Sequence, residues 1–234
     1  MPATAISDLS LSTARTSVRE KLLNIFVSPT DVFDEVIASP PNLANWRIPT
    51  LLVCLAGIVA IRTGNSHEQP AATIRNLTDA GTISVAQAQA LTGLWPLLSS
   101  LLICLAAFGG TCWSAFVLWF IGRVFLKVRF PYPKALEIVG LTGIILVLGS
   151  IVTALLFATS GDPAARPALS LIAHKMNPDR PLYQILQTLN IFHLWSTTAL
   201  AIGLSRLCNV SFKEAAFWVF GYWLAARIVL IFLQ

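Results

Sequence analysis

The chain has 234 residues, of which 56% are hydrophobic and 12% are charged, and its formal net charge at pH 7 is +5. Soluble proteins carry about 25% charged residues, so this composition excludes an ordinary soluble domain and indicates an integral membrane protein. At this length the spans and their connections account for most of the chain, and no sizeable soluble domain is expected.

Residues 1–17 are rich in Ser, Thr and Ala and predict a flexible N-terminal tail. They contain no apolar core or cleavage site of the kind that marks a signal peptide. We therefore expect the spans themselves to direct membrane insertion.

Residues 18–42 predict two short amphipathic helices. In the first, apolar residues recur at helical spacing, at Val18, Leu22, Ile25 and Phe26. A stripe of this kind needs an apolar surface to cover it, either lipid or protein.

The second amphipathic helix is predicted to begin at Pro29, with Ser28 as its N-cap and Asp31 in the position of a capping box. Its apolar stripe comprises Val32, Phe33, Val36 and Ile37. Two such helices directly ahead of a span either lie in the membrane interface or pack against the cytoplasmic ends of the bundle. The sequence leaves both arrangements open.

Residues 43–234 form the predicted membrane domain, which contains five apolar segments. The segments are Ile48–Ile61, Leu94–Ile121, Ile138–Thr159, Tyr183–Leu204 and Ala215–Leu233. About 20 apolar residues cross the hydrocarbon core of a bilayer as an α-helix, and the last four segments reach that length. The sequence therefore predicts an all-α, polytopic membrane protein with five transmembrane helices, preceded by the short amphipathic helices.

The first segment is the weakest of the five, because only 14 residues separate Arg47 from Arg62. Both arginines can snorkel to the membrane surface, and Trp46 is a candidate interface anchor. We expect a spanning helix from about Leu43 to Gly64, with a re-entrant segment as the alternative.

Two longer polar connections are predicted on the side opposite the N-terminus. Gly64–Leu91 forms the first, with a short helix over Ser84–Leu91, and the second span is expected to begin near Trp95 and Pro96. Gly161–Pro181 contains four prolines and is predicted to be irregular.

Basic residues are distributed unequally between the two sides of the membrane. The side of the N-terminus has ten, namely Arg15, Arg19, Lys21, Arg47, Arg123, Lys127, Arg129, Lys134, Arg206 and Lys213. The other side has five, namely Arg62, Arg75, Arg166, Lys175 and Arg180. By the positive-inside rule the N-terminus is cytoplasmic and the C-terminus is outside. We expect the basic loops to contact anionic lipid headgroups, and we expect no nucleic-acid partner.

Small residues recur at every fourth position on four of the spans. The stripes are Ala106, Gly110 and Ser114; Ser150, Ala154 and Ala158; Ala199 and Gly203; and Gly221 and Ala225. Such stripes let helix backbones approach closely in lipid, so we interpret them as packing surfaces in preference to a substrate path.

Few polar groups lie within the predicted spans. Glu137 and Glu214 stand at span starts, and no acidic residue lies in a span interior, which argues against an ion-coupled transporter. In the fourth span Asn190, His193 and Thr197 form a candidate polar stripe. Interhelical hydrogen bonding is the preferred interpretation of this stripe, ahead of a proton relay or a metal site.

Motifs of catalysis are missing from the sequence, which contains no H-E-x-x-H, no G-x-S-x-G, no P-loop and no dinucleotide-binding fingerprint. The four cysteines include no C-x-x-C pair and are interpreted as small apolar residues in packed helices. We therefore expect no enzymatic activity, no cofactor and no metal.

Three stretches carry a resemblance to a known family. They are Ser28–Val36 leading into Trp46–Pro49, Phe130–Gly140, and Asn190–Leu207 continuing through Val210–Ala215. With the five-span pattern, these stretches resemble the Yip family, five-span membrane proteins named for their interaction with Ypt/Rab GTPases. The resemblance implies a cytoplasmic N-terminus and an outward C-terminus, as the distribution of charge does.

The chain is similar in particular to the short bacterial members of that family. Trp46–Pro49 stands where eukaryotic members have an Asp-Leu-Tyr-Gly-Pro motif. The resemblance therefore implies the bacterial cytoplasmic (inner) membrane as the location, and it transfers no functional residue to this chain.

These observations predict a non-enzymatic membrane scaffold that acts through membrane or cytoplasmic protein partners, a second copy of the chain included, or through membrane organisation. The candidate contacts with partners or lipid are Phe26, Phe33, Ile37, Arg123, Lys127, Arg129 and Lys134. The alternative is a component of a small-molecule, lipid or ion transporter or channel, whose path would be lined by the stripe of Asn190, His193 and Thr197. An intramembrane enzyme ranks third.

Overall fold

The computed structural model describes residues 16–63, 68–161, 166–169, 186 and 189–232. The helices within these ranges are α1 (Val18–Asn24), α2 (Pro29–Ala38), α3 (Ala44–Thr63), α4 (Glu68–Asp79), α5 (Val85–Val124), α6 (Tyr132–Ser160), α8 (Ile191–Cys208) and α9 (Phe212–Phe232). The predicted all-α class is confirmed. Most of the predicted tail and most of the predicted Gly161–Pro181 connection lie outside the described residues.

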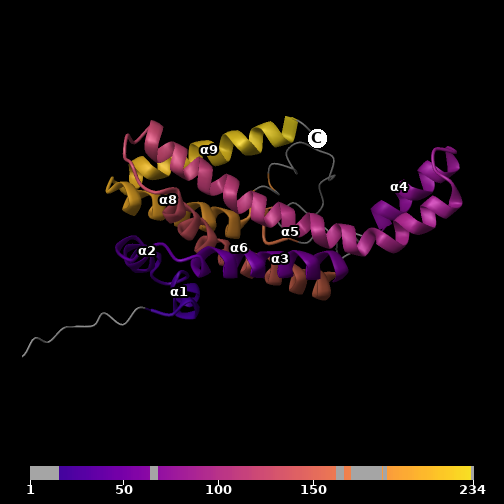
Figure 1. Ribbon diagram of the computed structural model, residues 1–234, viewed down its shortest axis with the longest axis horizontal. Helices are drawn as coiled ribbons and strands as arrows, with labels where there is room; N and C mark the ends of the chain where they lie inside the picture. Colours follow the sequence, from indigo (N-terminus) through magenta and orange to yellow (C-terminus); the bar gives the residue numbers. More distant parts are fainter. Residues whose placement is uncertain (1–15, 64–67, 162–165, 170–185, 187–188, 233–234) are drawn as a thin grey trace, which may run out of the picture.

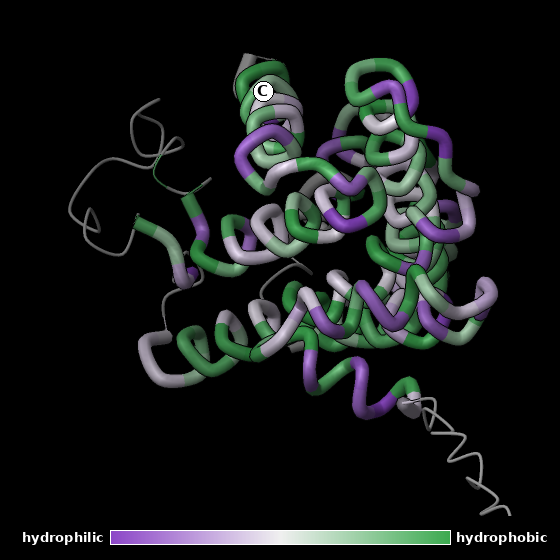
Figure 2. The backbone as a smooth tube through the Cα atoms, turned by 90° about the vertical axis from the view of Figure 1, so that its left-hand side faces the viewer, coloured by the Kyte–Doolittle hydropathy of each residue, from purple (hydrophilic) through white to green (hydrophobic). Residues whose placement is uncertain are grey.

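Successive long helices run side by side in alternating directions (Figure 1). One end of the bundle therefore collects α1, α2, the α5–α6 connection (residues 125–131) and the α8–α9 connection (residues 209–211). We call it the basic end, because the basic residues counted above on the side of the N-terminus gather there, apart from Arg15, which lies outside the described residues. Figure 2 looks onto this end, where hydrophilic stretches occupy α1 and several of the connections in front of apolar helices.

Both predicted N-terminal helices are present. A capping box starts α1: the Ser17 hydroxyl accepts the amide of Glu20 at 3.3 Å, and the Glu20 carboxylate accepts the amide of Ser17 at 2.8 Å. α2 begins at Pro29 as predicted, but the side chain of Ser28 makes no capping hydrogen bond. The capping box predicted for α2 is therefore wrong.

The apolar face of α2 is buried in the bundle. Val32, Phe33 and Val36 belong to a hydrophobic core that also takes side chains from α1, α5, α6, α8 and α9. A Cβ atom on Gly203 of α8 would lie 3.4 Å from the ring of Phe33 and 2.4 Å from a methyl group of Ile138. Of the two arrangements that the sequence left open, α2 adopts the one packed against the helix ends.

α3 has the extent expected for the first span and crosses α6 at very short range. A Cβ atom on Gly140 of α6 would lie 2.4 Å from the Cα atom of Trp46. Since no side chain fits in that space, the crossing requires glycine.

α5 departs most from the prediction. It begins at Val85 instead of near Trp95, because Ser84 and Gln87 form a capping box there and the helix continues through Pro96. Its 40 residues extend about 60 Å, twice the hydrocarbon core of about 30 Å. α4 packs against the extension, and the pair projects beyond the other helices at the end away from the basic end (Figure 1). The connection predicted as a polar loop is therefore largely a helical hairpin.

The third and fourth spans begin at different residues from those predicted. α6 starts at Tyr132, earlier than the predicted Ile138. α8 starts at Ile191, because Asn190 is its N-cap and accepts the amide of Phe192 at 2.9 Å. Tyr183, the predicted start of the fourth span, lies outside the described residues.

Three helices within the described ranges are long and apolar enough to cross a membrane, namely α3 over Ala44–Arg62, α5 and α6. Their outward faces expose large apolar side chains, among them Leu51, Leu101, Leu105 and Ile151. Apolar surface of this extent is stable against lipid and unstable against water. The structure thus supports a polytopic membrane protein.

Candidate functional site

The basic end is held together by a cluster of buried charged and polar side chains, which we call the clamp: Lys21, Glu35, Asn45, Lys134 and Glu137. Except for Glu35, these residues are at most 6% exposed. They come from α1, α2, α3 and α6. The clamp therefore joins the N-terminal helices to the membrane-spanning ones.

Lys134 lies at the centre of the clamp. Its Nζ atom donates to the carbonyl oxygens of Val36 and Ser39 at 2.5 Å each, and lies 3.2 Å from Oε1 of Glu137. The last carbonyl groups of a helix lack intrahelical partners and carry partial negative charge. α2 has no basic residue in its own last turn, so Lys134 of α6 supplies the cation from a different helix.

Glu137 is bound by α3 as well as by Lys134. Nδ2 of Asn45 donates to Oε2 of Glu137 at 2.6 Å. A buried carboxylate is tolerated only when a counter-charge and hydrogen bonds replace the water that it loses. Within the described residues, Oδ1 of Asn45 has no hydrogen-bond partner, and Oε1 of Glu137 has only the ion pair with Lys134.

Glu35 fixes α1 onto α2. Its carboxylate accepts the Thr16 amide at 3.1 Å and the Thr16 hydroxyl, and pairs with Nζ of Lys21 at 3.1 Å. Partial burial alone would raise the pKa of Glu35. The hydrogen bonds from Thr16 and Lys21 and the charge of Lys21 together outweigh that effect and hold this pKa below its ordinary value.

A more exposed link joins α2 to the C-terminal part of α8. The guanidinium of Arg206 donates through Nε and Nη2 to the two carboxylate oxygens of Asp34. Bidentate geometry favours such a pair, but both side chains are nearly half exposed, so solvent weakens it. We assign it the role of orienting α2.

The structure separates the predicted contact residues into two groups. Phe33 is fully buried in the core and Lys134 is buried in the clamp, so both support the fold, and contact of these two residues with a partner or lipid stays a prediction. Phe26 and Ile37 are half buried, and the ring of Phe26 packs edge-on against Trp195, with 5.5 Å between centroids.

Arg123 in the last turn of α5, together with Lys127 and Arg129 on the α5–α6 connection, is exposed at the basic end. We call the segment that carries these three residues, 123–129, the basic loop. Its backbone is folded tightly against the end of α5: the amide of Val128 donates to the carbonyl of Gly122 at 2.9 Å, and Lys127 has a φ of 57°. Positive φ is uncommon for a residue with a side chain. The loop therefore presents its cations in a defined arrangement.

An aromatic contact supports the same loop. Nε1 of Trp119 donates to the carbonyl of Phe130 at 3.2 Å, and the guanidinium of Arg123 lies over the Trp119 ring, 5.2 Å from its centroid. The electrons of a ring face attract a cation, so Trp119 helps to hold Arg123 in position.

Two residues of the predicted polar stripe of α8 form hydrogen bonds with the backbone of that helix. Asn190 serves as the N-cap, and the hydroxyl of Thr197 donates to the carbonyl of His193 at 2.7 Å within the same helix. His193 is the third residue of α8, whereas the sequence placed it about ten residues into the span. Two of the three side chains of the stripe thus form hydrogen bonds with backbone groups of α8 itself.

Four residues of the clamp were overlooked as functional positions in the sequence, namely Lys21, Glu35, Asn45 and Glu137. A local signal existed only for Lys134 and Glu137, which stand three apart on one helix and can therefore pair. Among the described residues, no group of three or more His, Cys, Asp or Glu side chains could hold a metal ion.

Comparison with known proteins assigns the family. The pattern that defines the Yip1 domain matches residues 23–233, which include most of the clamp, the basic loop and the long helices. No curated protein and no solved structure matches the chain. The resemblance noted in the sequence is confirmed: the chain belongs to the Yip1 domain family of multi-pass membrane proteins.

Proposed function

We propose that the protein is a non-enzymatic membrane scaffold that crosses the membrane five times and presents its basic end to the cytoplasm. α8 and α9, at 18 and 21 residues, extend about 27 and 32 Å, enough to cross the hydrocarbon core beside α3, α5 and α6. Because successive helices alternate in direction (Figure 1), all the connections of the basic end lie on one side of the membrane in this proposed arrangement. That side carries the excess of Lys and Arg, which favours a cytoplasmic location.

The observation that carries this proposal is the clamp. It fastens two amphipathic helices and the start of α6 into one unit, so that the basic loop projects from a rigid base. A rigid surface binds a partner without first losing conformational entropy. Three exposed cations on such a base are suited to an acidic protein surface or to anionic headgroups.

A pathway through the bundle receives less support. The transport alternative relied on Asn190, His193 and Thr197, yet two of these side chains form hydrogen bonds within α8 or at its start. Their polar atoms are thereby committed to the helix, which leaves fewer of them for a permeating solute.

The proposal is tested by placing a photoreactive amino acid at position 129 and cross-linking in the native membrane. A second site at Leu101, on the exposed apolar face of α5, reports background contacts with lipid. We expect one protein partner at position 129 that is absent at position 101. Because the photoreactive residue takes the place of Arg129, replacing Arg123 and Lys127 with Gln in the same protein should abolish the capture, while Lys213→Gln, elsewhere on the same end, should not.

Two results would count against the scaffold proposal. One is an identical set of products at positions 129 and 101. The other is a partner whose capture at position 129 survives the replacement of both Arg123 and Lys127, since that partner would not be recognised by the basic loop.

A further inference from the structure

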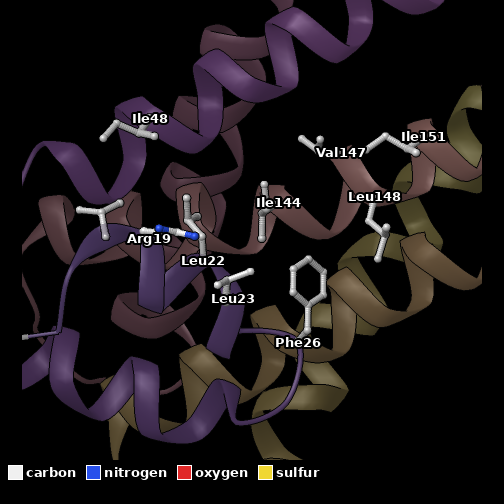
Figure 3. Close-up of a pocket in the computed structure, with 10 residues that line it drawn as sticks. Arg19, Leu22, Leu23, Phe26, Ile48, Ile144, Val147, Leu148 and Ile151 are labelled. Carbon is white, nitrogen blue, oxygen red and sulfur yellow. The ribbon is translucent and has the colours of Figure 1, made fainter.

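An apolar groove lies between α1 and the two spanning helices α3 and α6 (Figure 3). Its volume is about 460 Å³. Its walls include Leu22, Phe26, Ile48, Val147, Leu148 and Ile151. Figure 3 shows these side chains surrounding an opening between the helices.

The groove is shaped for a hydrocarbon chain. Its α6 wall runs from Ile144 to Ile151, a rise of about 10 Å along the helix. Ile48 and Ile151 keep about half of their surface exposed, so the apolar walls are left uncovered by protein. Two of the three walls come from helices that cross the membrane, and lipid chains are the apolar molecules available there.

Arg19 gives the groove a charged edge. It is the one charged residue among those that line the groove, it is exposed, and it lies at the basic end on α1. Within the described residues it forms no ion pair, whereas Lys21, on the same helix, is paired with Glu35. An unpaired guanidinium matches the geometry of a phosphate group.

We propose that this groove binds one acyl chain of an acidic glycerophospholipid, whose phosphate pairs with Arg19. The apolar walls hold the chain by the hydrophobic and dispersion contacts that acyl chains make, and Arg19 adds a preference for anionic headgroups. This inference rests on the proposed orientation of the basic end. It adds a specific lipid ligand at a surface separate from the basic loop.

The first test needs no substitution. The wild-type protein is placed in bilayer nanodiscs containing phosphatidylglycerol with a diazirine on its acyl chain, and the adducts are mapped after illumination. We expect labelling concentrated on α1 and on the stretch from Ile144 to Ile151. Leu97 to Leu105 of α5 form a face that is also apolar and exposed. Labelling of that face at the same level as the groove would overturn the proposal.

The second test separates the chain from the headgroup. Proteins from nanodiscs of phosphatidylglycerol mixed with phosphatidylcholine are examined by native mass spectrometry. Val147→Trp fills the groove and should remove the retained lipid, whereas Leu155→Trp, exposed one turn beyond the groove, should not. Arg19→Gln should reduce the retention of phosphatidylglycerol about tenfold, the effect of losing one charge-assisted hydrogen bond to its phosphate, and Arg47→Gln should leave that retention unchanged.

These outcomes are distinguishable from failure of the scaffold proposal. Retention of lipid by a folded Val147→Trp protein would exclude the groove as the site. Unchanged retention of phosphatidylglycerol by Arg19→Gln would exclude Arg19 as the phosphate ligand. Partner capture at position 129 tests a different surface and is unaffected by either result.

Discussion

At Lys134, one ammonium group satisfies two carbonyl oxygens at the end of α2 and lies beside a carboxylate of α6. A lysine in the first turn of a helix is normally disfavoured by the helix dipole. Here the carbonyl groups of α2 and the charge of Glu137 compensate for that effect. The charge of Lys134 is thus stabilised by α2 and by Glu137, and not by the dipole of α6.

Replacing Lys134 with Met should destabilise the protein strongly. The substitution leaves Glu137 buried without its counter-charge, a change that costs about 3 to 5 kcal/mol in comparable buried pairs. Unfolding in mixed detergent micelles measures the loss. Lys213→Met removes an exposed lysine and should have little effect.

Adding Glu137→Gln to Lys134→Met should recover part of the stability. Additive losses in the double variant would show that the two residues do not interact.

Glu35 should make the attachment of α1 sensitive to acid. Its folded-state pKa is lowered from an ordinary value of 4.5, so its contribution is complete above the unfolded pKa and disappears as the pH falls through the folded one. We expect Glu35→Gln to lower the thermal midpoint at pH 7, and we expect its difference from the wild type to shrink as the pH falls below 4.5. A difference that stays constant across this range would assign the effect of the substitution to packing instead of charge.

At the scale of helices, neighbouring helices approach closely only at some of the small residues, and the sequence does not show which ones. Gly203 and Gly110 both belong to stripes of small residues, yet a Cβ atom would clash at Gly203 and would meet nothing within 4 Å at Gly110. The stripe on α8 therefore packs within the chain as predicted, whereas Gly110 of α5 does not. Periodicity identifies a small face, but the partner of that face depends on the tertiary arrangement.

Gly140→Ala should disrupt the crossing of α3 and α6. The new methyl group would lie 2.4 Å from a backbone atom of Trp46, and backbone cannot move aside as a flexible side chain can. Overpacking of this kind costs about 1 to 3 kcal/mol. The matched control is Gly143→Ala, on the same helix, where the nearest atom is 3.6 Å away. Equal thermal stability of the two variants would show that the crossing relaxes easily.

The helices themselves were largely predictable, whereas their ends and their partners were not. Continuous apolar composition identified α3, α5 and α6 as spans, because a lipid-facing helix needs no polar side. The true start of α8 had a local signal in Asn190, a strong N-cap residue, which the apolar run before it obscured. The contact of Lys134 with Val36 joins residues 98 positions apart, and no local pattern encodes such a pair.

At the scale of the whole molecule, the clamp and the groove meet at α1. One side of this short helix carries Lys21, which pairs with Glu35, and another carries Arg19 and Leu22, which line the groove. The same helix therefore contacts both the protein core and the proposed lipid. Lipid bound in the groove would add contacts that hold α1 in place, and binding to the folded state stabilises it.

The arrangement of the whole chain across the membrane depends on whether α3 spans it. At 20 residues, α3 extends about 30 Å and is long enough to span the membrane.

The test replaces the native cysteines and introduces single cysteines at Asn24, Thr82 and Arg129. These exposed positions lie before α3, before α5 and after α5. If α3 crosses, a maleimide that cannot permeate membranes should label position 82 from outside the cell and reach positions 24 and 129 only after permeabilisation. A re-entrant α3 instead puts positions 24 and 82 on the same side. That result would leave four spans, and it would separate the N-terminal helices from the basic loop to which the clamp connects them.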